Sequence, residues 1–229
     1  MKFERQLAWP CRDCNVVASS FCRSLIGPIS AGPPAPKNRI PQVFFRADKD
    51  TVIPQNDLQF FSGPYVLCEG WAYRFFRFPD GRRQILSILI PGDLFSAFTL
   101  FNSLPTFSVQ SATDINICQF GRDGVKAELA ENPDICDAFG HLCASEIDEM
   151  SVASANLTEP NAVKRVAGFI LRIVKRLAAR GIENRTGVYP FPLTPTDIAD
   201  ATGLNPEDVN RALYKLREDC LFYLSHDNL

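Results

Sequence analysis

The sequence predicts an α+β protein in which a β-rich domain precedes a set of helices. Three observations support this: strand-like runs bounded by turn signals over residues 42–130, a long amphipathic stretch over 131–158, and two short helices joined by a glycine-containing turn within 159–229. Hydrophobic residues make up 46% of the 229 residues and charged residues 22%. This composition is ordinary for a globular protein, and the length suffices for one large core or two small ones.

The bulk properties argue against a membrane protein. No apolar run approaches the roughly 18–20 residues that a bilayer span requires, and residues 1–10 lack the apolar core of a signal peptide. We therefore expect a cytoplasmic protein with no membrane partner. The formal net charge of −2 does not indicate a nucleic-acid binder, although residues 161–229 carry a slight excess of basic side chains that weakly favours DNA binding there.

The β-rich region has regular turn signals. Glu69-Gly70, Asp80-Gly81 and Pro91-Gly92 place glycines 11 residues apart, a spacing that suits an antiparallel sandwich or barrel. The aromatic and aliphatic runs Trp71–Phe78 and Gln84–Ile90 lie between these turns. Asp80-Gly81 predicts a hairpin, because a type I′ turn requires residues that tolerate positive φ.

Residues 1–41 form a cysteine-bearing segment that ends in a connector rich in proline and glycine. Disulfides are disfavoured in the cytoplasm, so clustered cysteines indicate metal binding or redox sensing. Cys11-x2-Cys14-x7-Cys22 offers three thiolates, the ligand type of iron–sulfur clusters and of zinc. The other cysteines are interpreted as ordinary core or surface thiols: Cys68, Cys136, Cys143 and Cys220.

Asn132-Pro133 predicts the start of a long helix, because proline is favoured in the first turn. Apolar residues then recur mostly at steps of three or four and form a continuous stripe. The stripe suits helix pairing in a homodimer; the alternative is that it packs only on the β domain. The predicted dimer residues are Phe139, Leu142, Ile147, Met150 and Leu157.

A helix-turn-helix is predicted near the C-terminus. A helix over 161–180 precedes it, and its first short helix begins near Thr194. Thr202-Gly203 makes the turn, Asn205 caps the second helix and Pro206 occupies the first helical position. Two short helices joined by such a turn are typical of this DNA-binding motif.

The predicted reading face consists of Glu207, Asn210 and Arg211, which are three or four residues apart and share one side of the second helix. The start of this helix meets base edges in the major groove. Arginine can donate two hydrogen bonds to guanine, glutamate can accept from cytosine, and asparagine can pair with adenine. We therefore predict double-stranded DNA as a partner, with Thr194 and Lys215 as further contacts; the alternative is a solvated charged face.

The stretch LTPTDIADATGLNPEDVNRALYKLRED (193–219) resembles the DNA-binding motif of Crp/Fnr regulators, and EGWAYRFFRFPDGRRQILSILIPGDLF (69–95) resembles their effector domain. The resemblance implies a cyclic-nucleotide-binding-like β-roll, a long dimerisation helix and a C-terminal winged helix-turn-helix. We expect the wing to be shorter here than the fuller hairpin of the family. The resemblance also implies RNA polymerase as a partner and a palindrome related to TTGAT–ATCAA. Asn210 stands where FNR relatives carry serine, which alters the expected contact at one base. Met150 stands where FNR carries an acidic residue that opposes pairing, which favours a dimer even without a cofactor.

The same resemblance implies which cysteine is the fourth ligand. In FNR-like sensors this residue lies on a β-strand after the Pro-Gly-Asp turn, and Cys118 in SATDINICQF stands in that place. The implied cofactor is therefore an oxygen-sensitive [4Fe–4S] cluster held by Cys11, Cys14, Cys22 and Cys118.

Cyclic AMP is not expected. The segments that hold its phosphate in relatives read Phe95-Ser96-Ala97-Phe98 and Pro105-Thr106-Phe107 here, without the glutamate and the arginine. Zinc, reversible thiol oxidation and a constitutive cluster-free dimer stay open as alternatives. A haem- or nitric-oxide-responsive regulator is less favoured, because only His141 and His226 are available as histidine ligands. We expect no enzyme, since the thioredoxin-like βαβ unit that would follow a catalytic Cys-x2-Cys pair is not indicated.

Overall fold

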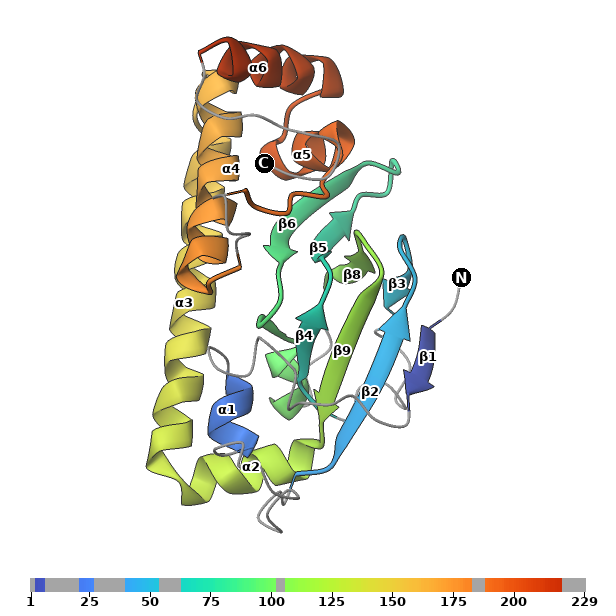
Figure 1. Ribbon diagram of the computed structural model, residues 1–229, viewed down its shortest axis with the longest axis vertical. Coiled ribbons are helices and arrows are strands. Elements are labelled where there is room, and N and C mark those ends of the chain that lie inside the picture. The colour runs from blue at the N-terminus through green and yellow to red at the C-terminus, as the bar shows by residue number, and fades with distance from the viewer. Residues whose placement is uncertain are drawn as a thin grey trace. The chain divides into compact units, whose positions relative to one another are not determined.

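The computed structural model describes residues 3–6, 21–26, 40–53, 63–101, 106–182 and 188–219. Apart from one short helix at residues 21–26 and a 3₁₀ helix at residues 97–101, the strands precede the helices, so the predicted α+β order is confirmed (Figure 1). The chain divides into two compact units. The first comprises Met1–Ala72 and Leu89–Glu146, and the second comprises Tyr73–Ile88 and Ile147–Leu229. A β-hairpin from the middle of the strand region therefore groups with the C-terminal helices.

A five-stranded antiparallel sheet forms the framework of the first unit, with the strand order β1-β2-β9-β4-β7. In this sheet Cys118 lies opposite Phe44 on one side and opposite Val66 on the other. The strands are β1 (Phe3–Gln6), β2 (Gln42–Ala47), β4 (Tyr65–Glu69), β7 (Leu94–Phe95) and β9 (Ile115–Phe120), and β3 (Val52–Ile53) pairs separately with β8 (Ser108–Ser111).

The two faces of this sheet belong to two different core clusters, because successive side chains of a strand point to opposite faces. One cluster is built from strand residues such as Leu67 and Ile117. The other, which we call the helix-side cluster, joins the sheet to the neighbouring helices. Its buried members are Phe21, Cys22, Leu25, Ile40, Val66, Leu94, Leu100, Cys118, Phe120, Val125 and Ile135.

The described part of this unit also contains helices: α1 (Phe21–Ile26), the 3₁₀ helix η3 (Ala97–Phe101), α2 (Arg122–Glu131) and the first part of α3 (Pro133–Leu157), which continues into the second unit. The predicted long helix is confirmed, with Pro133 in its first turn and 25 residues in all. Helix α2 was not expected as a separate element. Only Val125 of its ten residues is buried, so its sequence lacks the apolar stripe by which a surface helix is recognised.

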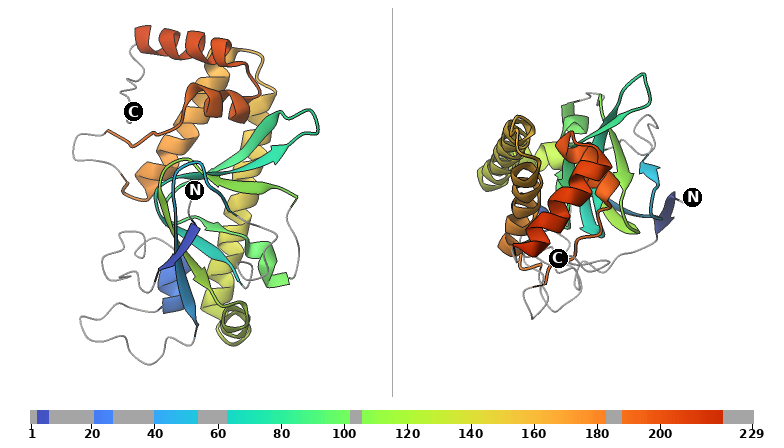
Figure 2. Two further views of the ribbon diagram at one scale, coloured as in Figure 1. Left: turned by 90° about the vertical axis from the view of Figure 1, so that its right-hand side faces the viewer. Right: turned by 90° about the horizontal axis from the view of Figure 1, so that it is seen from above.

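The described part of the second unit contains a hairpin, the later part of α3 and three further helices. The hairpin, β5 (Ala72–Arg77) and β6 (Arg83–Leu89), turns at Gly81 with φ +88°. This confirms the hairpin predicted at Asp80-Gly81 but not a type I′ turn, because Asp80 does not share the positive φ. Helices α4 (Ala162–Ala179), α5 (Pro195–Thr202) and α6 (Pro206–Glu218) pack against one another (Figures 1 and 2). Within the described ranges, no helix has both the length and the apolar content needed to cross a bilayer.

Candidate functional site

The first helix of the helix-turn-helix, α5, begins with a capping box. The Thr194 hydroxyl accepts a hydrogen bond from the Asp197 amide at 3.1 Å, and the Asp197 carboxylate accepts one from the Thr194 amide at 3.0 Å. The two residues thereby satisfy backbone donors that a helix start leaves open. Thr194 lies at the end of α5 where the helix dipole favours an anion such as a DNA phosphate.

The second helix, α6, starts as the sequence predicts. Gly203 adopts φ +65° at the end of α5 and so makes the turn, and Asn205 accepts a hydrogen bond from the Asp208 amide at 2.7 Å. Pro206 occupies the first helical position, where a backbone donor is not needed. Val209 and Leu216 are buried against the rest of the motif, which fixes the side of α6 that faces away from the core.

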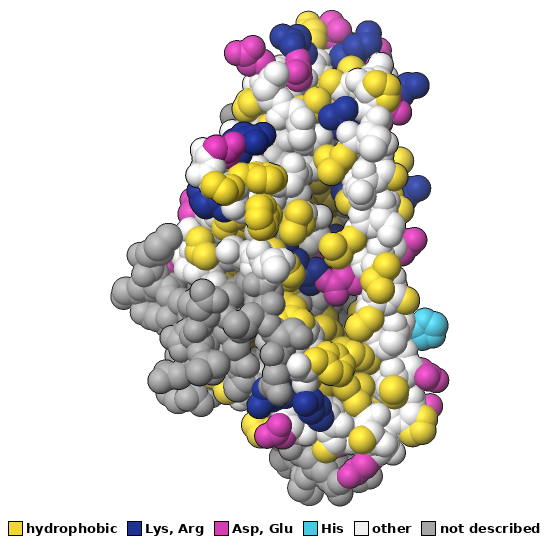
Figure 3. Space-filling view, turned by 180° about the vertical axis from the view of Figure 1, so that it is seen from behind, with side chains coloured by type: hydrophobic (Ala, Val, Ile, Leu, Met, Phe, Trp, Pro, Cys, Tyr) yellow, Lys and Arg dark blue, Asp and Glu magenta, His cyan; other side chains and the backbone are white. Residues whose placement is uncertain are grey.

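That outward side carries the predicted reading residues. Glu207, Asn210, Arg211 and Lys215 are all exposed. Tyr214 joins them with 64% of its surface exposed, and the sequence argument missed it. Its spacing was the available signal, because it follows Asn210 by four residues and Arg211 by three. The space-filling view shows basic and acidic side chains intermixed around α6 rather than one uniform basic patch (Figure 3).

Local charges act on this face. Arg211 is ion-paired with Asp208, one turn earlier on α6. A hydrogen bond with Glu218 raises the pKa of the Tyr214 phenol, and the negative charge of Glu218 adds to the effect. Tyr214 therefore presents a neutral hydroxyl at physiological pH.

Arg165 of α4 ties the motif to the chain that enters it. Its guanidinium donates to the Glu159 carbonyl at 2.7 Å and to the Thr202 carbonyl at 3.2 Å. Asn156 donates to the Arg165 carbonyl at 3.0 Å. These bonds connect the end of α3 to the end of α5, just before the turn into α6.

Two of the four predicted cluster ligands are described, and both lie in the helix-side cluster. Cys22 of α1 is 5% exposed and Cys118 of β9 is 2% exposed. Cys68 of β4, partly buried, packs against the same cluster. Cys11 and Cys14 lie outside the described residues. Among the residues that are described, no group of three or more His, Cys, Asp and Glu could hold a metal ion, so this ligand set stays a prediction.

The predicted pairing stripe of α3 falls into two parts. Phe139 and Leu142 pack against the helix-side cluster, and the ring of Phe139 lies 5.5 Å from that of Phe21. By contrast, Ile147 is 66% exposed, Met150 47% and Leu157 37%. The later part of α3 therefore offers a free apolar surface, and hydrophobic side chains recur along this helix in Figure 3.

Residues 95–98 and 105–107, which correspond to the segments that hold the cyclic AMP phosphate in relatives, are rich in aromatic side chains. The rings of Phe98 and Phe107 pack edge to face with centroids 5.7 Å apart. Ser96, between β7 and η3, is buried and has φ +66°. Pro105 lies outside the described residues.

A β-rich effector unit, a long helix and a helix-turn-helix together define a DNA-binding transcription regulator. Residues 45–132 match the cyclic nucleotide-binding domain, and residues 164–224 match the Crp-like helix-turn-helix domain. The chain belongs to the Crp/Fnr family, whose members are transcription regulators rather than enzymes. Regulators of this family bind DNA and typically act as dimers.

Similar proteins agree with this family. The nitrogen fixation regulation protein FixK of Bradyrhizobium diazoefficiens is 26% identical over 219 residues, which cover 96% of this chain and 88% of that protein. The anaerobic regulatory protein of Pasteurella multocida is 26% identical over 177 residues, covering 77% and 60%. The solved structure of FixK2 from Bradyrhizobium japonicum superposes with a TM-score of 0.70 at 24% identity, over 82% of this chain and 91% of that one.

Proposed function

We propose that this protein is a cytoplasmic, dimeric regulator that senses oxygen through a [4Fe–4S] cluster and binds a palindromic DNA site. The ligands would be Cys11, Cys14, Cys22 and Cys118. The observation that supports this best is the burial of Cys22 and Cys118, which are distant in sequence, within one core cluster. The similarity to an anaerobic regulatory protein supports a role in the response to oxygen.

The surroundings of these two thiols suit such a cofactor. Cys22 and Cys118 are soft sulfur donors, and their neighbours in the helix-side cluster are almost entirely apolar. Restricted solvent access of this kind controls the potential and lability of an iron–sulfur group. When bound, the cluster would make the protein sensitive to oxygen, because oxygen degrades such clusters. Cys68 is a weaker candidate, because it is only partly buried and packs against the cluster from outside, whereas Cys118 is one of its buried members.

The helix-side cluster also links the proposed sensor to the dimer helix. Ile135 of α3 is one of its buried members, and Phe139 and Leu142 pack against it. Phe21 precedes Cys22 in α1 and contacts the ring of Phe139. Ligation through Cys22 would therefore restrain α1 and, through Phe21, the first turns of α3.

Dimerisation would use the exposed continuation of α3. Ile147, Met150 and Leu157 form the apolar surface available for pairing with a second copy. A two-fold dimer places its recognition helices about one DNA turn apart. Glu207, Asn210 and Arg211 would then read one half-site of a palindrome related to TTGAT–ATCAA, and loss of ligation would weaken this arrangement.

Anaerobic purification followed by iron and sulfide analysis tests the proposal. We expect about four irons per chain, the number in a [4Fe–4S] cluster. Cys118→Ala should lose the iron and the anaerobic footprint on the palindromic duplex. Cys68→Ala is the matched control, because it removes a thiol next to the same core cluster, and it should retain both. Zinc or no metal in the wild-type protein, or an unchanged anaerobic footprint of Cys118→Ala, would overturn the proposal.

A further inference from the structure

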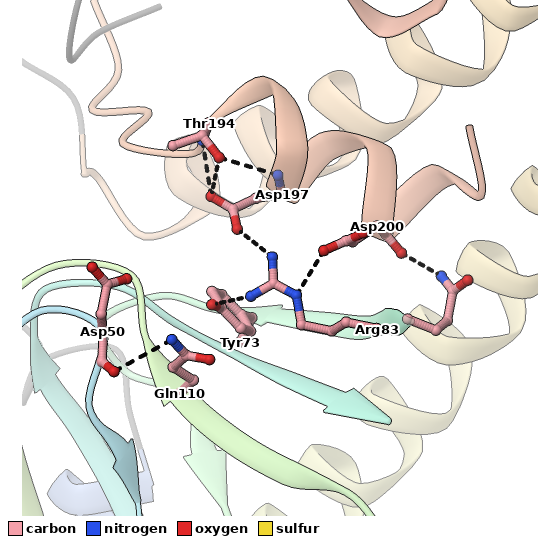
Figure 4. A network of polar contacts seen from close by, with 8 residues as sticks. Asp50, Tyr73, Arg83, Gln110, Thr194, Asp197 and Asp200 are labelled. Atoms are coloured by element: carbon pink, nitrogen blue, oxygen red, sulfur yellow. Dashed lines mark hydrogen bonds and ion pairs between the residues drawn. The ribbon is translucent and has the colours of Figure 1, made fainter. Parts of the chain in front are cut away.

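Arg83 of β6 joins the β5–β6 hairpin to the first helix of the helix-turn-helix. Its guanidinium donates to the Asp200 carboxylate through Nε at 2.6 Å and to the Asp197 carboxylate through Nη2 at 2.9 Å. Its third nitrogen donates to the hydroxyl of Tyr73 on β5. Figure 4 shows the guanidinium between the two carboxylates of α5. All of these residues belong to the same compact unit.

This contact is shielded from water. The side chains of Arg83, Asp197 and Asp200 are 17%, 13% and 24% exposed. Burial alone would lower the pKa of the guanidinium, but the hydrogen bond with Asp200 and the charges of Tyr73 and Asp200 outweigh it and raise that pKa. Because ion pairs in a shielded site need complete hydrogen bonding, a bond on each guanidinium nitrogen makes this a specific attachment.

Two further hydrogen bonds attach the hairpin to the helices. Gln84, the next residue of β6, donates to the carbonyl of Asp200 at 2.6 Å. At the far end of the same strand, the Ile88 carbonyl accepts from Arg176 of α4 at 2.9 Å. Both α5 and α4 are therefore bonded to a strand that lies between β5 and β7 in sequence, far from the helix-turn-helix.

We propose that Arg83 is a positioning residue for DNA binding. It fixes the helix-turn-helix to an arm of the effector domain and so sets where each recognition helix stands in the dimer. The chain supports this role, because the hairpin continues directly into β4 at one end and β7 at the other. This inference rests on the proposed dimer, in which two recognition helices must match two half-sites at a fixed separation.

The consequence is a spacing requirement that Arg83 enforces. Each helix-turn-helix can still read its own half-site without Arg83, since none of the bonds of Arg83 involves α6. A pair of loosely held motifs, however, would accept half-sites at several separations and would bind the best separation less tightly. A residue with a merely structural role would instead weaken binding to every duplex.

The test uses the full chain and duplexes in which the spacer between the two half-sites changes one base pair at a time, together with a single half-site. Arg83→Gln should weaken binding at the preferred spacing about three- to thirty-fold, flatten the dependence on spacing and leave half-site binding at low salt unchanged. Asp200→Asn should act in the same way, and the double variant should be no worse than either single one. Arg83→Lys, which keeps the charge but not the planar fork, should restore part of the preference.

Arg82→Gln is the matched control. Arg82 adjoins Arg83, but it pairs at 2.7 Å with Asp80 in the hairpin turn and its side chain is 76% exposed, so its loss should leave spacing preference intact. If Arg83→Gln keeps the wild-type preference, or weakens half-site and palindrome equally, the positioning role is wrong while the dimer stands. If the wild-type protein shows no preference and sediments as a monomer, the proposed dimer fails, and the positioning role fails with it.

Discussion

Asp208 and Arg211 form an ion pair across one turn of α6, on the outward face of the recognition helix. The pair leaves the Arg211 side chain 71% exposed, so a base edge can reach it. We expect Arg211→Ala to weaken binding to the palindromic duplex by about 1–3 kcal/mol and to change binding to a scrambled duplex little, because a bidentate contact to guanine is sequence-specific. Fluorescence anisotropy at one fixed salt concentration measures both affinities.

Lys215 provides the comparison for Arg211, since it lies one turn further along the same helix and we expect it to contact a phosphate as a point charge. Lys215→Ala should weaken binding to both duplexes by a similar factor and reduce the salt slope by about 1. If Arg211→Ala instead loses the same affinity for the palindromic and the scrambled duplex, Arg211 does not read a base.

The start of the recognition helix depends on the side chain of Asn205. Its carbonyl oxygen accepts from the Asp208 amide at 2.7 Å, and its amide nitrogen donates to the Asp208 carboxylate at 2.8 Å. Asn205→Ala should lower the free energy of unfolding by about 1 kcal/mol, the usual cost of a lost N-cap. Asn205→Ser keeps an acceptor and should lose less. Urea unfolding followed by circular dichroism measures the difference, and equal losses for serine and alanine would argue against the cap.

Alanine substitutions at two turn glycines distinguish the cost of backbone strain from the cost of steric overlap. Gly70 and Gly81 have φ of +81° and +88°. A Cβ at Gly81 meets nothing within 4 Å, whereas a Cβ at Gly70 lies 2.1 Å from the backbone oxygen of Asp114. Gly81→Ala should therefore cost about 1–2 kcal/mol of unfolding free energy, the price of a left-handed alanine. Gly70→Ala should cost about 3 kcal/mol or more, because overlap is added to strain. Similar costs in urea unfolding would rule out the contact at Gly70.

The helices of the C-terminal motif could be predicted because their signals are local. Thr194, Gly203, Asn205 and Pro206 occupy the cap, turn and first-turn positions that their side chains favour. Strand β1 (Phe3–Gln6) was not predicted, because its sequence FERQ has one apolar residue and no alternation. Its place is set by pairing with β2, a long-range contact that no local pattern reveals.

The grouping of the hairpin with the helix-turn-helix depends on the same kind of long-range contact. Arg83 and Asp200 are 117 residues apart, and each alone is an ordinary charged residue in an amphipathic element. The sequence likewise identified Cys22 and Cys118 as candidate ligands, but only the fold places them in one core cluster with Phe21 and Ile135. Residue type thus indicated the chemistry of these positions, while their proximity required the tertiary structure.

Met150 tests whether the exposed part of α3 is the pairing surface. It is 47% exposed, and in a two-fold dimer this stripe meets its own copy. Met150→Glu should place two carboxylates near each other at the interface, where like charges cost several kcal/mol. The metal-free protein should then dissociate at concentrations at least about tenfold higher than the wild type, as measured by sedimentation velocity. Ser145→Glu is the control, because it adds the same charge at an exposed position that lies five residues away and therefore on a different side of the helix. An unchanged dimer in Met150→Glu, or equal dissociation in both variants, would place the pairing surface elsewhere.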